Sequence, residues 1–557
     1  MKNPAALQSR IMKIPRAALA FLFAISLPAW AASKADAAKT DKPKDLCTPP
    51  PAGVAPSLPA RILEGQGSAY INFPITTLSP KAQEFFTQGV AQMHSFWANE
   101  AERSFLQAAA LDPQSPMPWW GIAMVASGDY RPRFQLDTQE LMFGKSKPVR
   151  NRASEAMEKA LALAGNASDL EKMYIAALQA RRLPAQGTDP DEGYTKGLNA
   201  LIAKYPGQVE AKLFLALHTM RGFKLPSHEP KPGTMEADNL LRQLAMEFPD
   251  HPGVHHYIIH GFEGAAFAKD AWPSCKRYAE LVTNIPHALH MPGHIYSQTG
   301  RWDDAVKAFS DASVNELGWI NADKLYGRGH HGHNVHYQST AYAFSGQYDK
   351  AIATAQTLLD FSENPREAAQ IDGFNTIYRQ GWFAMLRALV QAQRWDDVLA
   401  GKLLPEYYKP REQAWRHWAR GLAFTAQGKT AKAKAEAKLM DESFREFVAK
   451  VKRQPTEELQ VARLELEGHI AASARRYKRA LNVLQTASDR ERKLVYSEPP
   501  YYPRPVALAL GDMAAKRGDL ARAAKAYGAA LEQFPDGVAA RKGLEKVTGG
   551  GVAAGTE

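Results

Sequence analysis

The sequence contains very little cysteine and no large excess of one charge. Its 557 residues include only two cysteines, Cys47 and Cys275, which excludes a small fold held together by many disulfides. Exported proteins meet oxidising conditions, and the sequence leaves open whether Cys47 and Cys275 form a disulfide or remain free thiols. The net charge is +11, but acidic residues are interleaved along the chain and no basic run alternates with aromatic residues. The composition therefore gives no indication of a nucleic-acid partner.

Long hydrophobic runs are also absent beyond the N-terminus. The apolar run Ala17–Ile25 follows several basic residues and is too short for a membrane span. It precedes Ala29-Trp30-Ala31, which has the A-x-A pattern of a signal-peptidase cleavage site. We therefore expect residues 1–31 to be a signal peptide and the mature protein, without a transmembrane span, to be periplasmic or secreted.

Several other patterns are missing from the sequence. It has no alternating runs rich in Val, Ile and Thr and no Asn-Gly hairpin turns, which argues against a β-sheet fold. It also has no phosphate-binding loop, no serine nucleophile elbow and no specific Cys–His arrangement. These absences favour a binding protein over an enzyme.

A helical repeat is present instead. Gly89, Ala101, Phe105, Ala108 and Pro113 are 12, 4, 3 and 5 residues apart, which is the spacing of the tetratricopeptide repeat (TPR). In that repeat small residues let two antiparallel helices approach, and the proline ends the second helix. Further copies contain Gly293, Ala305, Phe309 and Ala312, and Gly511, Ala523, Tyr527, Ala530 and Pro535.

The repeats predict the domain organisation. We expect an all-α, TPR-like α-solenoid over residues 79–547, stable only because its repeats stack on one another. Residues 32–78 are rich in Pro, Ala and Lys and predict an extended N-terminal arm. Residues 548–557 have the composition of a disordered tail.

Several motifs extend beyond the repeat spacing. They are Trp119-Trp120-Gly121-Ile122-Ala123, His251-Pro252-Gly253, His256-Tyr257, His260, His290–Tyr296 (HMPGHIY), Gly300-Arg301-Trp302, Glu498-Pro499-Pro500, Pro503 and Leu510-Gly511. With Gly89–Pro113, they make the chain resemble a family of exported bacterial tetratricopeptide-repeat proteins. The resemblance implies the solenoid fold and export, and it leaves the activity open.

Histidine is concentrated in the central repeats, residues 251–340. Eleven of the sixteen histidines lie there: His251, His255, His256, His260, His287, His290, His294, His330, His331, His333 and His336. Because histidine is the side chain that titrates nearest neutral pH and a common metal ligand, this concentration suggests a functional role.

The repeat register predicts where these side chains point. In solenoids of the family that the chain resembles, positions 2, 5 and 9 of each first helix face the concave groove. His287, His290 and His294 occupy those positions in one repeat, and His333 and His336 occupy positions 2 and 5 of the next. His256 and Glu263 occupy positions 2 and 9 of the preceding repeat, with His260 at position 6. We therefore expect three consecutive first helices to present these residues to one wall of the groove.

Two histidine pairs have the spacing of metal chelators. His256/His260 and His290/His294 are each four residues apart, so both members of a pair face one side of a helix. Neutral imidazole suits zinc, copper and nickel, and Glu263 or His336 would complete a site. The metal candidates are thus His256, His260, His290 and His294. The alternative is a histidine network that hydrogen-bonds internally and binds nothing.

The sequence favours an exported binding or scaffold protein that holds a protein or peptide segment in a histidine-lined groove, with or without a metal. One alternative is a periplasmic protein that binds copper, zinc or nickel as cargo. A second is a metal-dependent hydrolase in which Glu263 is the general base. His255, His330 and His331 are expected to be solvated or loop residues.

Overall fold

The computed structural model describes residues 60–126, 152–322, 329–363, 365–369, 371–373, 376–494, 497 and 499–549. The expected signal peptide, most of the arm, Cys47 and most of the C-terminal tail lie outside these residues. In the described part of the chain, no helix has both the length and the apolar character needed to cross a membrane.

Helices account for almost all of the described regular structure. The α-helices are α1 Pro80–His94, α2 Ala98–Leu111, α3 Met117–Val125, α5 Arg152–Ala162, α6 Asp169–Arg182, α7 Pro190–Lys204, α8 Val209–Thr219, α9 Thr234–Glu247, α10 Pro252–Phe262, α11 Trp272–Leu281, α12 Pro286–Gln298, α13 Trp302–Ala322, α14 Gly329–Phe344, α15 Tyr348–Leu359, α16 Pro365–Ala368, α17 Ile377–Gln391, α18 Trp395–Ala400, α19 Pro410–Ala426, α20 Thr430–Val451, α21 Glu457–Ser473, α22 Tyr477–Glu491, α23 Val506–Lys516, α24 Leu520–Gln533 and α25 Val538–Thr548. Short 3-10 helices cover Ser68–Tyr70, Ala164–Asn166 and Ala268–Ala271. The strands β1 Phe223–Lys224 and β2 Glu229–Pro230 form one antiparallel pair.

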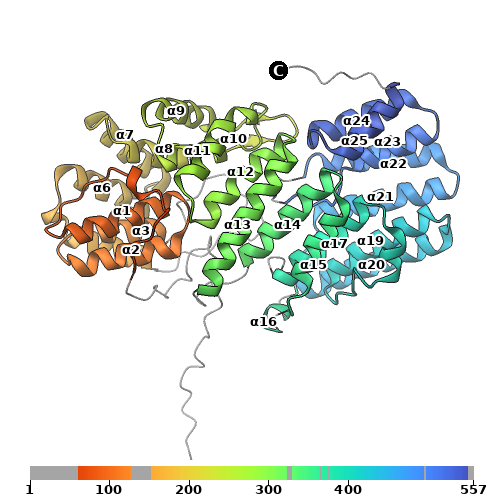
Figure 1. Ribbon diagram of the computed structural model, residues 1–557, viewed down its shortest axis with the longest axis horizontal. Helices are drawn as coiled ribbons and strands as arrows, with labels where there is room; N and C mark the ends of the chain where they lie inside the picture. Colours follow the sequence, from red (N-terminus) through yellow and green to blue (C-terminus); the bar gives the residue numbers. More distant parts are fainter. Residues whose placement is uncertain are drawn as a thin grey trace, which may run out of the picture. The chain divides into compact units, whose positions relative to one another are not determined.

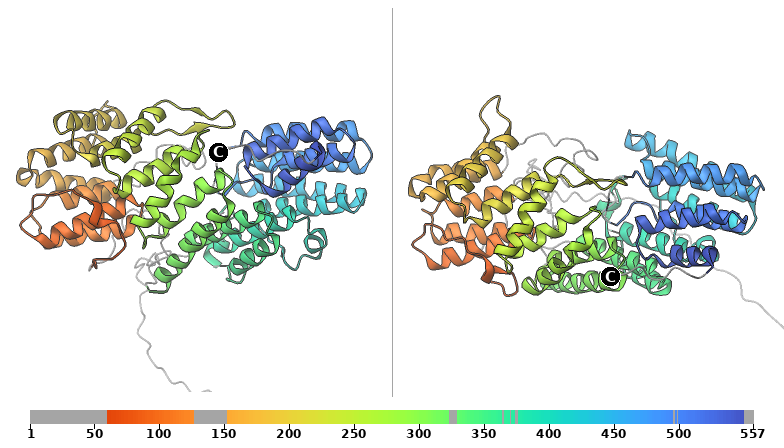
Figure 2. Two further views of the ribbon diagram at one scale, coloured as in Figure 1. Left: turned by 45° about the horizontal axis from the view of Figure 1, so that its top comes forward. Right: turned by 90° about the horizontal axis from the view of Figure 1, so that it is seen from above.

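Successive helices pack as antiparallel pairs, as seen for α1 with α2 and α12 with α13 (Figures 1 and 2). The glycine of the repeat lies where the two helices of a pair come closest. A Cβ atom on Gly293 would lie 2.5 Å from Cε1 of Phe309, and one on Gly89 would lie 2.6 Å from Cε1 of Phe105. The ring on the second helix thus fills the space left by the glycine on the first. The chain has the all-α, TPR-like solenoid fold that this spacing predicts.

The close contact at Gly293 predicts the effect of adding one methyl group. Gly293→Ala forces the methyl against the buried Phe309 ring, and overpacking of this kind lowers the free energy of unfolding by about 1–3 kcal/mol. Gly318→Ala is the matched control, because Gly318 lies within α13 and a Cβ there would meet no atom within 4 Å. Because alanine has a higher helix propensity than glycine, the Gly318→Ala change is expected to leave the free energy of unfolding unchanged or to raise it by up to about 1 kcal/mol. Urea denaturation of both variants measures the difference, and equal stabilities would contradict this account of the repeat.

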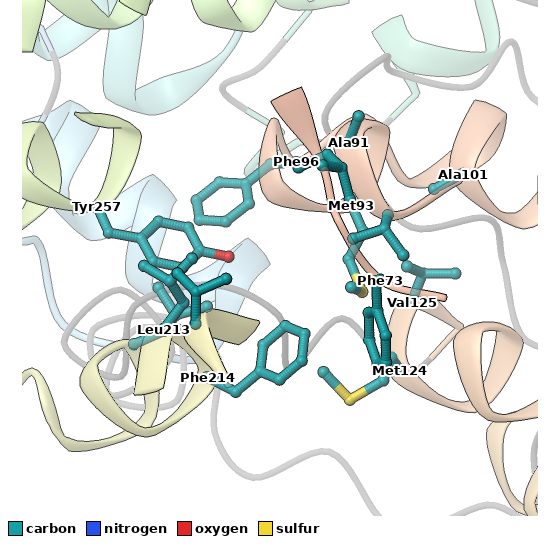
Figure 3. Packing of buried hydrophobic residues seen from close by; sticks show 14 of the residues in the cluster. Phe73, Ala91, Met93, Phe96, Ala101, Met124, Val125, Leu213, Phe214 and Tyr257 are labelled. Carbon is teal, nitrogen blue, oxygen red and sulfur yellow. The ribbon is translucent and has the colours of Figure 1, made fainter. Parts of the chain in front are cut away.

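Buried apolar side chains form two large clusters, one within residues 71–320 and one within residues 355–527. Figure 3 shows part of the first cluster, including Phe96 and Tyr257, whose ring centroids are 6.0 Å apart. Their positions matter because both side chains contact histidines of α10 or α1.

Hydrogen bonds join the segment before α1 to α1 itself and to the residues just before α12. Gln88 of α1 accepts a hydrogen bond from the Leu63 amide and donates one to the Arg61 carbonyl. Gln66 donates to the carbonyl of Asn284, just before α12. The described end of the predicted arm is therefore fixed next to the helices that carry the central histidines.

Candidate metal centre

The central histidines are carried by α10, α12 and α14, and most of them are buried. Pro252 and Pro286 occupy the first turns of α10 and α12, where a missing backbone N–H is tolerated, so both helices begin just before their histidines. His256, His260, His290 and His294 are at most 2% exposed, whereas His287 and His333 are partly buried. These side chains therefore form an interior cluster, in which only His287 and His333 have intermediate exposure.

The first histidine group consists of His256, His260 and His287. Each offers a ring nitrogen, and the three atoms lie within 4.8 Å of one another. The His256 Nδ1 donates to the carbonyl oxygen of His94 at 2.5 Å, which leaves the lone pair of the neutral ring on Nε2. Within the described residues, His256 Nε2 and both ring nitrogens of His287 have no hydrogen-bond partner. Buried nitrogens of this kind are costly unless a ligand satisfies them.

The second histidine group consists of His290, His294 and His333. The Nε2 atom of His290 lies 2.6 Å from Nε2 of His294 and 3.3 Å from Nε2 of His333. In a tetrahedral zinc site with Zn–N distances of about 2.0–2.1 Å, neighbouring nitrogens lie roughly 3.3 Å apart. The His290–His333 separation matches this spacing, whereas the His290–His294 separation is that of a hydrogen bond, so a metal ion would displace one proton and move these two rings apart by about 0.7 Å.

Glu263, directly after α10, connects the two groups. Its Oε2 accepts from His260 Nδ1 at 3.3 Å, and its Oε1 accepts from His294 Nδ1 at 2.8 Å. With the proton on Nδ1, each neutral ring carries its lone pair on Nε2, the atom that ligates a metal. A carboxylate behind the Nδ1 atom of a ligating histidine is the common arrangement of outer-shell residues in metal sites. Glu263 therefore positions one histidine of each group.

Phe96, in the turn between α1 and α2, packs against all three rings of the first group, and the sequence analysis did not predict this contact. The Phe96 ring lies 4.4 Å from His256, 5.3 Å from His260 and 5.5 Å from His287 between centroids. Phe96 adopts a φ of +54°, a conformation that non-glycine residues rarely take, so the turn holds its ring here at a conformational cost. No spacing in the sequence connects residue 96 with residues 256–287.

A third cluster lies behind the first group. Glu210 of α8 accepts from Nε2 of His94 at 2.5 Å and from Nε2 of His251 at 3.1 Å. His94 Nδ1 lies 2.9 Å from the hydroxyl of Tyr257. Burial opposes ionisation of Glu210, yet the two histidines lower its pKa below the ordinary value, as expected for a paired carboxylate. The backbone oxygen of His94 accepts from His256, so this cluster supports the first group.

The electrostatics keep these rings neutral. Burial lowers the pKa of His256, His287, His290 and His333 well below the ordinary value, and neighbouring histidines lower it further. Burial also raises the pKa of Glu263, against the opposing effect of the hydrogen bond from His294. Neutral imidazole is the form that binds metals, so these rings are ready to ligate at neutral pH.

The other expected site residues are placed differently. His336 donates toward Gln380 and packs on Phe383, and it belongs to neither group. The expectation that His255, His330 and His331 are solvated or loop residues is wrong. All three are at most 7% exposed and lie on helices. Each ring nitrogen of His255 has a protein partner. The ring centroid of His330 lies 6.1 Å from that of His287 and 5.4 Å from that of His290.

The four-histidine metal set divides in the structure. His256 and His260 join His287, while His290 and His294 join His333. The reason is that each i, i+4 pair is completed by a histidine from the next first helix, which the sequence cannot align in space. For the disulfide, Cys275 is buried in α11 and Cys47 lies outside the described residues, so their pairing remains a prediction.

Comparisons with known proteins add no argument about this site. No known family profile and no curated protein matches the sequence. Solved structures do align, among them the TPR domain of P58(IPK), at 12% identity over 84% of this chain and 97% of that one, with a TM-score of 0.21. Yeast Tom70 aligns at 12% identity, covering 84% of this chain and 95% of Tom70, with a TM-score of 0.34. The human IFIT1 dimer with PPP-AAAA aligns at 13% identity, covering 88% of this chain and 95% of IFIT1, with a TM-score of 0.30.

Proposed function

We propose that this protein is a transition-metal-binding helical-repeat protein with two three-histidine sites at its centre. The observation that carries the proposal is the convergence of three Nε2 atoms in the second group, at 2.6 Å and 3.3 Å, with Glu263 behind one of the rings. The same carboxylate orients a ring of the first group, so the two sites share a positioning residue.

The donor set indicates which metals these sites would take. Each group supplies three imidazole nitrogens, which suit zinc, copper and nickel and disfavour magnesium and calcium. Three protein ligands leave one tetrahedral position for water or another ligand. Glu263 contacts the Nδ1 atoms, on the opposite side of each ring from the ligating nitrogens. In this proposal it is therefore a positioning residue, with no part as a general base for hydrolysis.

Elemental analysis of the untagged protein purified from its own host tests the proposal. We expect near-stoichiometric zinc, copper or nickel in the wild type and a reduced content in the His290→Ala/His294→Ala variant. Circular dichroism of the variant establishes that it is folded. A wild type without metal that also takes up none on titration would refute the proposed function.

Glu263→Gln is expected to weaken both sites. A glutamine has one carbonyl oxygen, so it can accept a hydrogen bond from only one of the two Nδ1–H groups. Its amide N–H group faces the Nδ1 atom of the other ring, which must then act as an acceptor. In that ring the proton therefore moves to Nε2, the atom that would bind the metal. Loss of such an outer-shell partner weakens metal binding about 10–100-fold. Competition with a chromophoric chelator measures the affinities. Glu280→Gln, an exposed change on α11, is the control, and equal affinities in the two variants would contradict the positioning role.

Export and protein interaction complete the proposal. The N-terminal features of the sequence support cleavage after Ala31, and N-terminal sequencing of the mature protein tests this. The solenoid fold supports a role in binding a protein or peptide segment, since helical repeats present extended surfaces. Most of the histidines are buried, so such a partner would mainly contact other side chains.

A further inference from the structure

A second candidate site is a cavity of about 620 Å³ beside α14. This volume is within the range of small-molecule pockets, roughly 300–1,000 Å³. Aromatic side chains make up much of its wall: Trp272, Trp302, Tyr337, Phe344, Tyr502 and Phe534. The cavity adjoins the second histidine group through Tyr337, whose ring centroid lies 5.2 Å from that of His294.

One part of the wall is a stack of three rings. Trp302 and Phe344 lie 4.9 Å apart at 14°, and Phe344 and Phe534 lie 4.4 Å apart at 16°. The Trp302 indole N–H donates to the carbonyl of Pro535, which fixes this end of the stack. Both faces of Phe344 are covered by its neighbours in the stack, so the three rings offer an apolar aromatic surface to the body of a ligand.

A buried carboxyl group also lines the cavity. Glu491, at the end of α22, is 3% exposed, and its Oε1 accepts from the Gln533 amide at 2.5 Å. The Val506 amide also lies near this carboxyl and lowers its pKa, but no side chain among the described residues donates to Oε2 and no described cation forms an ion pair with the group. A buried carboxyl group without a counter-cation, on a residue that lines a ligand-sized cavity, suggests that a ligand supplies the positive charge.

The charged groups around Glu491 are already engaged with other residues. Arg492 pairs with Glu532 at 2.8 Å, at the more exposed edge of the cavity. Glu465, on α21, pairs with Arg504 at 2.9 Å. Lys269, which also lines the cavity, is exposed. Burial and the nearby Glu465 carboxylate raise the pKa of Glu491 to about 8, against the lowering effects of Gln533, the Val506 amide and Arg492.

We propose that this cavity binds an organic ammonium ion with an apolar or aromatic body, its charged nitrogen against Glu491 and its body against the ring stack. The proposal is independent of the metal sites. Glu491 is protonated at neutral pH in the free protein, and binding of a cation favours its ionised form. Binding therefore releases a proton below pH 8, and affinity rises as pH approaches that value. Between pH 6 and 7 the ionised fraction, and with it the affinity, increases about tenfold.

Three probes of similar shape test the charge preference by calorimetry: 2-phenylethylammonium, 2-phenylethanol and phenylacetate. We expect the cation to bind at least about tenfold more tightly than the alcohol, and phenylacetate to bind most weakly. Glu491→Gln should abolish the preference for the cation and its pH dependence. This variant is expected to fold, because the group that it replaces is uncharged at neutral pH and the glutamine oxygen still accepts from Gln533.

Glu280→Gln is the control, since it removes an exposed carboxylate on α11 that does not line the cavity. It is expected to change the affinity for 2-phenylethylammonium less than about twofold. Failure of all three probes to bind would overturn the proposal. So would equal affinity for the cation and the alcohol, or unchanged cation affinity in Glu491→Gln.

Discussion

Zinc added to the metal-free protein is expected to raise its free energy of unfolding by about 5 kcal/mol. A ligand at 100 times its dissociation constant that binds only the folded state contributes about 2.7 kcal/mol per site, and the histidine groups provide two sites. The gain is large because the ligands come from three helices, α10, α12 and α14, which unfolding separates. Urea denaturation with and without zinc measures the difference.

A variant of the second histidine group shows how much of the zinc-dependent stabilisation each group contributes. The His290→Ala/His294→Ala variant retains the first group and is expected to keep about half of the zinc-dependent stabilisation. Magnesium is the control ion, because it prefers oxygen ligands and should stabilise neither protein. Equal stabilisation by magnesium and zinc, or a full zinc effect in the variant, would contradict binding at the histidine groups.

Acidification is expected to destabilise the metal-free protein strongly between pH 7 and pH 5. Burial lowers the pKa of five histidines well below the ordinary value: His256, His287, His290, His333 and His336. Below about pH 6.5 the unfolded chain binds protons at these positions and the folded protein does not, so stability falls as pH falls. Each such histidine contributes about 1.4 kcal/mol per pH unit.

Three buried acids oppose this trend. Burial raises the pKa of Asp238 to about 7 and that of Glu491 to about 8, and it raises the pKa of Glu263 as well. Over the range where these acids are protonated in the folded protein and ionised in the unfolded chain, they favour folding at lower pH. The five histidines outnumber these acids, so a net loss of stability on acidification is still expected. Urea midpoints at several pH values from 7.5 to 5 measure the slope, and midpoints independent of pH would show that the histidines are not held neutral.

The sequence predicted the repeats because their signal is local. The separation of twelve residues between Gly293 and Ala305, followed by Phe309, specifies one helix, its turn and the contact between the two helices. It also placed His290 and His294 on one side of a helix. These relations depend on the geometry of a single helix or helix pair, which the order of residues determines.

The arrangement of the site depends on contacts that the sequence does not specify. His94 and Phe96 lie about 160 residues before the histidines that they contact, and the turn holding them has no local signature. The sequence selected Glu263 as a ligand or base by its repeat position, whereas the structure places it behind two rings. Burial of His330 was missed because the glycines around it resemble a loop, although α14 begins at Gly329.

Anomalous diffraction from crystals of the zinc-loaded protein would locate the bound metal ions. Two strong peaks are expected at the zinc edge. One lies among the ring nitrogens of His256, His260 and His287, and the other among the Nε2 atoms of His290, His294 and His333. Each peak should have three nitrogen ligands at about 2.0–2.1 Å. Peaks found only at surface residues or at the His94–Glu210–His251 cluster, with both histidine groups empty, would contradict metal binding at the histidine groups.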